Sequence, residues 1–190
     1  MDDSPNPETT AAIADRLEAA GVVGTFFMIG NNTRAAAELM PRLVQGGHEL
    51  ANHLMADRPA WRMTPAAFEA DLLACDAILQ DYGTPRHFRP PSGIYRPWMP
   101  QIAARHGYRT VLGDAFPLDT HLPWQAARRW LLRHLVRPGS IIILHDRHTR
   151  GRRTAETLDW LLPWLAEQEL QGVRLSDLLP SPPHSPRQGP

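Results

Sequence analysis

The stretch of sequence that decides the fold is IIILHD at residues 141–146, an unbroken apolar run that ends in an imidazole and a carboxylate. A short continuous apolar run is typical of a strand that is buried on both faces, as the strands of a parallel sheet are. Helices are predicted on either side of it, over residues 124–136 and 154–168, and the second should bend at Pro163. A buried strand between two helices is the repeating unit of α/β folds.

The rest of the chain repeats this alternation. Strands are predicted at residues 22–29, 49–52, 87–90, 108–113 and 173–175, and helices at residues 7–20, 34–44, 64–80 and 97–106. Glycines that suit helix ends follow several of these helices, at Gly21, Gly46 and Gly83. With a stub of a strand at Met1, the pattern predicts a parallel sheet of about seven strands with helices outside it, either open and doubly wound or closed into a barrel.

The composition is typical of one globular domain, which we expect to span residues 1–179. Hydrophobic residues make up 43% of the 190 and charged residues 21%. The 20 basic and 20 acidic residues balance, which argues against a nucleic-acid partner, and no apolar run reaches the roughly 20 residues that span a bilayer. Cys75 stands alone and is interpreted as core filling. Residues 180–190, rich in Pro and Ser, are expected to be disordered.

The sequence carries no clear signal for the location of the protein in the cell. No secretory signal is visible, so the chain as given is compatible with the cytoplasm. A leader upstream of Met1 would not be visible, however, and the sequence therefore predicts no location.

Most of the reactive side chains follow predicted strands. Because the carboxyl ends of parallel strands lie on one face, side chains placed there converge, and the active sites of α/β folds are built at that face. The predicted group consists of Asp2, Asp3, His53, Asp57, Arg89, Asp119 and His145. Unrelated surface residues would be scattered over both ends of the sheet, so the grouping itself indicates a functional site.

The adjacent carboxylates of Asp2 and Asp3 are candidates for catalysis and metal binding. Like charges this close raise the pKa of one carboxyl unless a cation or an arginine neutralises one of them. His53 and Asp57 stand on one face of a helical turn, and with Asp3 they could give a divalent cation one imidazole and two carboxylates. Arg89 precedes two prolines that stiffen the backbone at a strand end, where its guanidinium can hydrogen-bond a carboxylate and fix its orientation. Taken alone, each feature also has an ordinary interpretation, as a solvated turn, a capped turn or a packing residue.

Five ordered motifs carry a resemblance to a known family: DDSP at residues 2–5, TFFMIG at 25–30, GHELANH at 47–53, RPPSG at 89–93 and LHD at 144–146. Together they resemble the polysaccharide deacetylases of the NodB-homology type, carbohydrate esterase family 4, over nearly all of residues 1–179. The resemblance implies an α/β fold closed into a deformed (β/α)7 barrel. The first strand of that barrel is expected to be truncated here, because only Met1 precedes Asp2.

The resemblance also implies a role for each residue of the site. By position, Asp2 corresponds to the catalytic base, Asp3 and His53 to ligands of a divalent metal, Arg89 to the residue that orients the base, and His145 to the catalytic acid. The implied activity is metal-dependent hydrolysis of an acyl group, most simply N-acetyl, on an amino sugar. The bond broken is a carbon–nitrogen bond other than a peptide bond, and the expected partner is carbohydrate.

The chain departs from the family pattern at several positions. Asp57 stands where the family has a second histidine ligand, which predicts a harder, more anionic site; zinc is the expected ion, but other metals should be tolerated. Asp119 matches an acid of the family's fourth motif and is expected to tune His145, with Asp114 a less well aligned candidate. Ser4 replaces the usual glycine.

Two other functions fit the same residues. One is a non-catalytic relative that binds carbohydrate without turnover, because its metal site is compromised. The other is a hydrolase of the same fold that acts on carbon–nitrogen bonds outside sugars. Trp61, Tyr95 and Trp98 fall in loops of the predicted reactive face and are candidates for stacking on a sugar ring, with packing in the core as the alternative.

Overall fold

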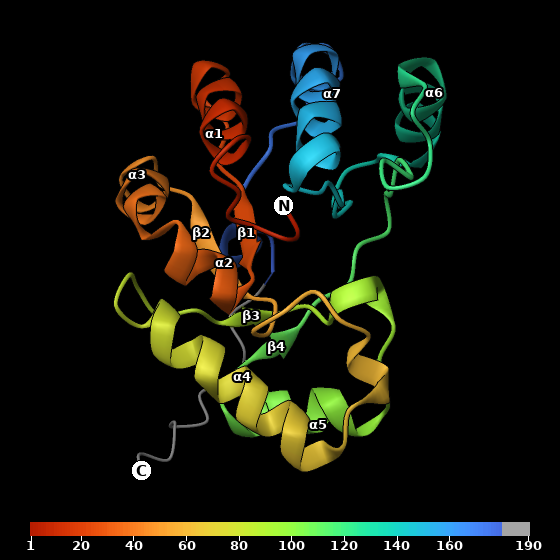
Figure 1. The fold of residues 1–190 in the computed structure, drawn as a ribbon. Coiled ribbons are helices and arrows are strands. Elements are labelled where there is room, and N and C mark those ends of the chain that lie inside the picture. The colour runs from red at the N-terminus through yellow and green to blue at the C-terminus, as the bar shows by residue number, and fades with distance from the viewer. Residues whose placement is uncertain (180–190) are drawn as a thin grey trace.

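The computed structural model describes residues 1–179, so the predicted disorder of residues 180–190 falls outside the described part of the chain. Its sheet is parallel and has the strand order β1-β2-β3-β4. The strands are short: β1 (Thr25–Met28), β2 (Glu49–Asn52), β3 (His87–Phe88) and β4 (Arg109–Thr110). Figure 1 shows them at the centre of the molecule. The predicted strand at residues 49–52 coincides with β2, whereas the others are shorter than predicted.

Isolated bridges outside the named strands close this sheet into a ring. They pair Ala115 with Ile142, Asp2 with His145, and Ser4 with Met28, all in parallel. The first bridge links the segment after β4 to residues 141–145, and the other two link those residues through the N-terminal segment back to β1. The predicted deformed barrel is confirmed, with residues 141–145 as one of its walls although only single bridges form there.

Helices connect the walls of the barrel and cover it. They are α1 (Thr10–Ala19), α2 (Gly30–Ala35), α3 (Met40–Gln45), α4 (Pro65–Leu79), α5 (Trp98–Arg105), α6 (Gln125–Leu135), α7 (His148–Glu167) and α8 (Leu175–Leu178), with 3₁₀ turns η1 (Ala37–Leu39), η2 (Ala60–Arg62) and η3 (Pro91–Gly93). In Figure 1, α1, α7 and α6 stand side by side at the top of the view, and α4 and α5 pack together at the bottom. Within residues 1–179, no helix has the length and apolar character needed to cross a membrane.

Two predictions, one of a helix and one of a strand, are corrected by the structure. The single helix predicted over residues 34–44 is divided into α2, η1 and α3, because Pro41 has no backbone N–H to donate within a helix and fits best in a first turn, where it stands in α3. The strand predicted at 173–175 is wrong, since α8 begins at Leu175. The Leu175 backbone N–H donates to Thr25 Oγ1 at 2.9 Å, and the Ser176 hydroxyl donates to Glu49 Oε1 at 2.5 Å. These bonds attach the start of α8 to the first residues of β1 and β2, so this segment does not continue as a strand.

The core lies on both sides of the sheet, and Cys75 belongs to it. One apolar cluster joins α1, α3 and α7 to β1, and a second lies under α4 and α5. Burial raises the pKa of the Cys75 thiol to about 12, and its sulfur faces the Met28 carbonyl oxygen at 3.5 Å. A buried thiol that stays protonated is not a nucleophile. Cys75 therefore fills the core, as the sequence indicated.

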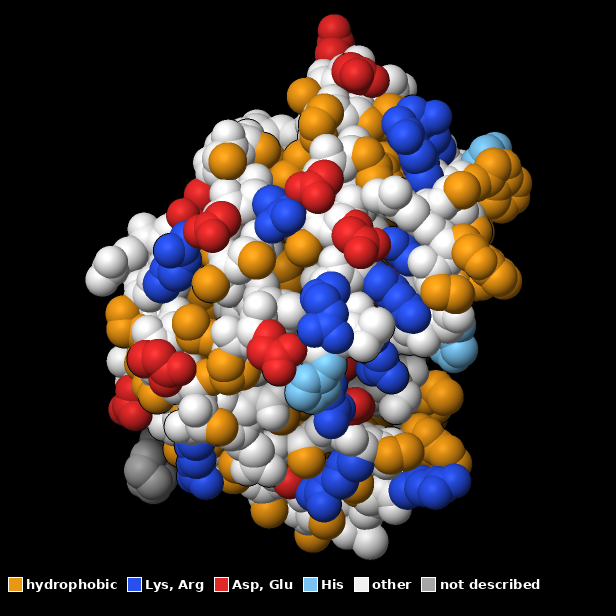
Figure 2. Space-filling view, turned by 45° about the horizontal axis from the view of Figure 1, so that its top comes forward, with side chains coloured by type: hydrophobic (Ala, Val, Ile, Leu, Met, Phe, Trp, Pro, Cys, Tyr) orange, Lys and Arg blue, Asp and Glu red, His pale blue; other side chains and the backbone are white. Residues whose placement is uncertain are grey.

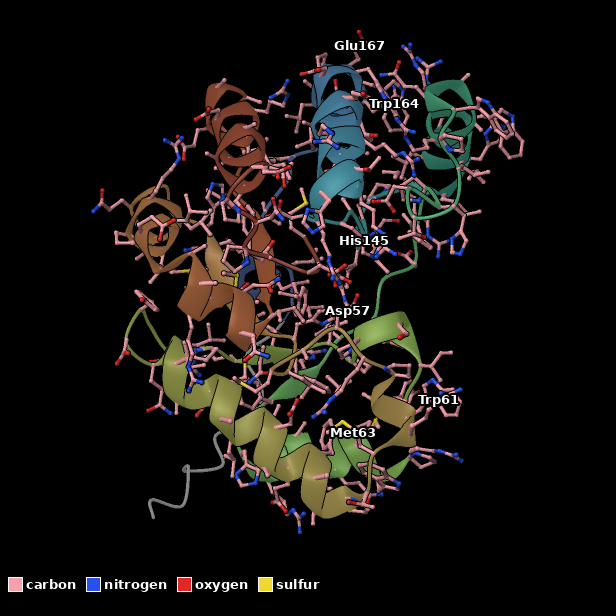
Figure 3. All side chains as sticks on the ribbon, in the orientation of Figure 1. Asp57, Trp61, Met63, His145, Trp164 and Glu167 are labelled. Carbon is pink, nitrogen blue, oxygen red and sulfur yellow. The ribbon has the colours of Figure 1, made fainter. Side chains whose placement is uncertain are left out.

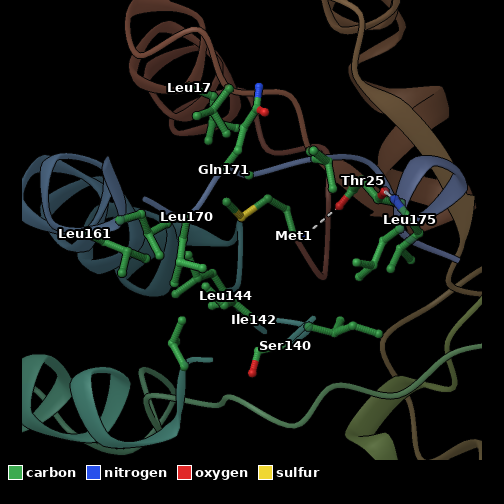
Figure 4. A pocket seen from close by; sticks show the side chains of 18 of the residues that line it. Met1, Leu17, Thr25, Ser140, Ile142, Leu144, Leu161, Leu170, Gln171 and Leu175 are labelled. Carbon is green, nitrogen blue, oxygen red and sulfur yellow. Dashed lines mark hydrogen bonds between the residues drawn. The ribbon is translucent and has the colours of Figure 1, made fainter. Parts of the chain in front are cut away.

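The amino end of the barrel holds an apolar cavity of about 190 Å³. Leu17 of α1 and Leu161 of α7 line it, and Figure 4 shows the Met1 side chain pointing into it toward Leu170. The Met1 amino group donates to the Thr25 carbonyl oxygen at 2.7 Å, which fixes the start of the chain against β1. Most of the residues that line this cavity are apolar. The charged side chains of the predicted site lie instead at the opposite end of the barrel, where the strands have their carboxyl ends.

Candidate active site

A polar pocket of about 420 Å³ opens at the carboxyl ends of the strands. Six of the seven predicted site residues line it: Asp2, Asp3, His53, Asp57, Arg89 and His145. In Figure 3, Asp57 and His145 lie on facing segments, between the lower end of α7 and the loops beneath it. On the face shown in Figure 2, acidic and basic side chains are interspersed rather than separated into patches.

Asp2 and Arg89 form a buried ion pair. Arg89 Nη1 donates to Asp2 Oδ1 at 2.7 Å, while Arg89 Nε donates to the Val111 carbonyl oxygen at 3.1 Å. The guanidinium also lies 4.1 Å above the centre of the Phe27 ring, which fixes its plane. Burial by itself would raise the pKa of Asp2, but the charge of Arg89, helped by His53, holds that pKa well below its usual range. Asp2 is therefore an ionised carboxylate with a fixed orientation.

Asp3 is the next residue and behaves in the opposite way. Its backbone has a φ of 64°, in the left-handed region, and Asn32 Nδ2 donates to its carbonyl oxygen at 3.1 Å. Burial raises the pKa of the Asp3 carboxyl, the charge of His53 opposes this, and the nearby negative charge of Asp57 adds to it. A buried carboxyl with a raised pKa is one that a cation would stabilise.

His53 has the orientation of a metal ligand. Its Nδ1 lies 2.7 Å from the Arg89 carbonyl oxygen, and since a carbonyl can only accept, Nδ1 carries the hydrogen. Nε2 then faces Asp3 Oδ1 at 3.7 Å. Two ligand atoms that share one cation through bonds of about 2.1 Å lie roughly 3–3.5 Å apart, so Asp3 and His53 fit a divalent cation after a small adjustment. A carbonyl that orients the second imidazole nitrogen is typical of metal-binding histidines.

Asp57 shares the pocket but has a different partner. Arg147 Nη1 donates to Asp57 Oδ2 at 2.8 Å, and Arg150 Nη1 lies 3.4 Å from Asp3 Oδ2. Among residues 1–179, no three side chains of His, Cys, Asp or Glu are arranged to hold a metal ion together. The structure thus brings two of the three predicted ligands together and turns the third toward an arginine that the sequence analysis did not assign.

His145 and Asp119 form a second charged pair at the pocket. His145 Nδ1 lies 2.9 Å from Asp119 Oδ1, and the His145 backbone N–H donates to Asp119 Oδ2 at 3.0 Å. Burial disfavours the charged imidazolium, but the hydrogen bond and the charge of Asp119 outweigh it and raise the pKa of His145. Arg153 Nη1 donates to the Asp119 carbonyl oxygen at 2.9 Å and holds the loop in place. Asp114, the other candidate, instead accepts from the Ile141 backbone N–H at 2.7 Å.

Asp146 is a structural residue of the site that the sequence analysis did not assign. Its buried carboxylate accepts hydrogen bonds from Ser4 Oγ at 3.0 Å, from Thr9 Oγ1 at 2.6 Å and from the Thr10 hydroxyl. These bonds tie the end of segment 141–145 to the N-terminal segment that carries Asp2 and Asp3. The only sequence signal was its place directly after His145 in the LHD motif.

The aromatic residues proposed for sugar stacking lie apart from the pocket. Trp98 packs edge-on against Phe68 with ring centres 5.5 Å apart, and Trp61 packs against the same core cluster. Figure 3 shows Trp61 at the outer edge of the molecule, away from His145 and Asp57. Tyr95 is exposed. The aromatic ring that does line the pocket is Phe116, whose centre lies 5.6 Å from that of the His145 ring.

Known proteins resemble this chain in sequence and in fold. The sequence pattern of the family described as polysaccharide deacetylase matches residues 1–111. A chitooligosaccharide deacetylase from a Bradyrhizobium species is 31% identical, over 87% of this chain and 82% of its own length. A peptidoglycan-N-acetylglucosamine deacetylase from Bacillus cereus is 30% identical, over 94% of this chain and 85% of its own.

Solved structures share the fold. Peptidoglycan deacetylase PdaC from Bacillus subtilis superposes with a TM-score of 0.84 at 24% identity, covering 94% of this chain and 86% of its own. A pseudoenzyme of carbohydrate esterase family 4 from Bacillus anthracis superposes with a TM-score of 0.86 at 21% identity, covering 95% and 64%. The fold is thus common to active and inactive proteins, whereas the family follows from the matched sequence pattern and the two relatives of 30% identity or more. This chain belongs to the polysaccharide deacetylase family.

Proposed function

We propose that this chain is a metal-dependent deacetylase that removes N-acetyl groups from amino sugars in a carbohydrate, and that residues 1–179 act as one catalytic domain. The observation that carries the proposal is the pairing of charges across one pocket. Arg89 keeps Asp2 ionised, and Asp119 favours the protonated form of His145. A base and an acid therefore face the same space at the same pH. The relatives named as chitooligosaccharide and peptidoglycan deacetylases support carbohydrate as the substrate class.

Asp3 and His53 are the residues proposed to hold the cation, with zinc as the first candidate. Their donor atoms face each other at 3.7 Å, and both side chains are buried. Deacetylases of carbohydrate esterase family 4 depend on metal in general. The chemistry that a divalent cation would supply here is polarisation of the acyl carbonyl and a lower pKa for a water.

Proton transfer is assigned to this chain's own residues. Asp2 accepts a proton from the water that attacks the acyl carbon, and Arg89 keeps the Asp2 carboxylate aimed at the pocket. His145 donates its proton to the sugar nitrogen as the carbon–nitrogen bond breaks, so that acetate and a free amine are released. General base and general acid catalysis of this kind contribute about 10²- to 10⁴-fold each.

Acetate release from N-acetylated chitooligosaccharides tests the proposal. The protein supplied with zinc should release acetate, a chelator should stop the release, and Asp2→Asn should lower kcat by about 10²-fold or more while leaving zinc content unchanged. Asp159→Asn is the matched control, because Asp159 pairs with Arg16 on the surface, far from the pocket. An Asp2→Asn variant with wild-type kcat would contradict the assignment of the base.

The same assay separates the two other functions. Oligosaccharide binding without acetate release, in protein shown to contain zinc, would instead support a non-catalytic carbohydrate-binding relative. This alternative is favoured by one observation, the ion pair that Asp57 of the pocket forms with Arg147. Turnover of cyclic amides or imides without turnover of N-acetylated sugars would support a hydrolase of carbon–nitrogen bonds outside sugars.

A further inference from the structure

We propose that Arg147 competes with the divalent cation for Asp57, so that Asp57 alternates between a guanidinium partner and a metal partner. The inference rests on the proposed cation site at Asp3 and His53 and assigns Arg147 a function in it. In the structure, Asp57 is in the first of these states. Movement of Arg147 would free a second carboxylate for the cation and set how tightly the cation is held.

Asp57 lies beside the proposed cation site, because it lines the same pocket as Asp3 and His53. Two carboxylates that share one pocket repel unless a positive group lies between or beside them. Here each carboxylate has one arginine: Arg147 on Asp57 at 2.8 Å and Arg150 near Asp3 at 3.4 Å. The arginines thus supply the positive charge that a divalent cation would otherwise supply.

Arg147 is placed for this role by the start of α7. It is the residue that precedes the helix, and its carbonyl oxygen accepts from the Gly151 backbone N–H at 3.2 Å. Just before it, the His145 carbonyl oxygen accepts from Thr154 Oγ1 at 2.8 Å. The backbone is therefore anchored on both sides of Arg147. Only the side chain has to move for Asp57 to be released.

Release of Asp57 requires little disruption. The Arg147 side chain is 42% exposed and that of Asp57 is 29% exposed, so water is available to both groups when they part. An ion pair of this exposure is weak compared with a bond between a carboxylate and a divalent cation. Competition by Arg147 should therefore weaken cation binding by a small factor and not prevent it. By contrast, the buried pair of Arg89 and Asp2 has no such freedom.

Cation affinity measured without turnover tests the proposal. Apoprotein would be titrated with Zn²⁺ against a chromophoric chelator and with Co²⁺ by its visible absorption. Arg147→Met removes the guanidinium but keeps the length of the side chain, and it should tighten zinc binding about five-fold, which corresponds to about 1 kcal/mol. Arg147→Lys keeps a charge and should stay close to wild type. Arg152→Met is the matched control, because Arg152 pairs with the exposed Glu8 at 3.4 Å.

A double-mutant cycle with Asp57→Asn shows whether Arg147 acts through Asp57. In the Asp57→Asn background, Arg147 has lost its partner, and Arg147→Met should leave zinc affinity unchanged. An equal gain in both backgrounds, or unchanged or weaker binding in Arg147→Met alone, would overturn the competition. The proposed cation site would fail separately, if Asp3→Asn and His53→Asn bound zinc as tightly as the wild type. The two failures are thus distinguished by different variants.

Discussion

Two neighbouring aspartates show how strongly surroundings decide the chemistry of a residue. Asp2 and Asp3 are chemically identical and adjacent, yet the pKa of one is lowered and that of the other raised. Burial pushes both upward, so the difference comes from Arg89, which contacts Asp2 at 2.7 Å. Asp3 has only a more distant arginine, at 3.4 Å. The sequence predicted that such a pair needs a cation or an arginine, and the structure shows which residue has which.

At the same scale, we expect Asp119→Asn to shift the alkaline limb of the pH profile. In the proposed mechanism His145 donates a proton and can do so only while protonated, so activity should fall as the pH rises through its pKa. Asp119 raises that pKa, and a neutral partner would lower it, so the alkaline limb should move to lower pH. At the alkaline end of the range, the rate should fall by about ten-fold or more relative to the wild type.

Profiles of kcat/KM against pH measure this effect. Asp2 does not set the acid limb near neutrality, because Arg89 keeps its pKa well below the usual range. Asp114→Asn is a suitable control, since Asp114 accepts from Ile141 and does not contact His145. An unchanged alkaline limb in Asp119→Asn would show that Asp119 does not set the protonation of His145.

Asp146 should contribute mainly to stability. Asp146→Ala leaves the buried hydroxyls of Ser4, Thr9 and Thr10 without their common acceptor, which should lower the free energy of unfolding by about 2–4 kcal/mol. Urea unfolding measures the loss, and Asp159→Ala, which removes an exposed pair, should cost under about 1 kcal/mol. A loss in Asp146→Ala no greater than in the control would mean that the hydroxyls find other partners.

At the scale of elements, helices and strands with local signals were predicted well. β2 has the predicted bounds, and α4 begins at Pro65, where Thr64 Oγ1 accepts from the Ala67 backbone N–H at 3.2 Å. Helix α7 begins at His148, six residues before its predicted start. Its first six residues, HTRGRR, include three arginines and no large apolar side chain, so no local pattern indicated a helix there. Helix α7 packs against α1.

Gly151 allows α7 to approach α1, and this predicts the effect of a larger residue. Ala is usually more stable than Gly in a helix by about 1 kcal/mol. At Gly151, however, a Cβ would lie 2.4 Å from Thr9 Oγ1 and 2.6 Å from Thr9 Cβ, so Gly151→Ala must push the two helices apart. We expect a loss of about 1–3 kcal/mol in the free energy of unfolding.

Thermal and urea unfolding test this prediction. Arg152→Ala, at the next position of the same helix but exposed, should change stability by under about 0.5 kcal/mol. A stabilising Gly151→Ala would show that helix propensity outweighs the close contact. Because Arg147 and Arg150 stand at the start of α7, the variant should also alter cation affinity.

At the scale of the whole molecule, closure of the barrel assembles the site. Asp2 and Arg89 are 87 positions apart, and Ser4 and Asp146 are 142 apart. The bridges from Asp2 to His145 and from Ser4 to Met28 place the N-terminal segment between two walls of the barrel. The proposed base, acid and metal ligands therefore come together only in the folded chain.

Cation binding should stabilise this closed barrel. A ligand that binds only the folded state at about 100 times its Kd adds about 2.7 kcal/mol, which for a domain of this size raises Tm by roughly 5–10 °C. Zinc should produce this rise in the wild type and not in Asp3→Asn, as measured by calorimetry with and without a chelator. An equal rise in both proteins would place zinc elsewhere than at Asp3 and His53.

The sequence by itself determined the alternation of strands and helices, the face on which the reactive residues converge, and the family, because these depend on local periodicity and on the order of short motifs. Only the tertiary structure decided which aspartate carries the charge and that Asp57 pairs with Arg147, 90 positions away. The physical reason is that pKa values and ion pairs depend on burial and on distances between groups remote in the chain. Neither quantity is written in any local stretch of residues.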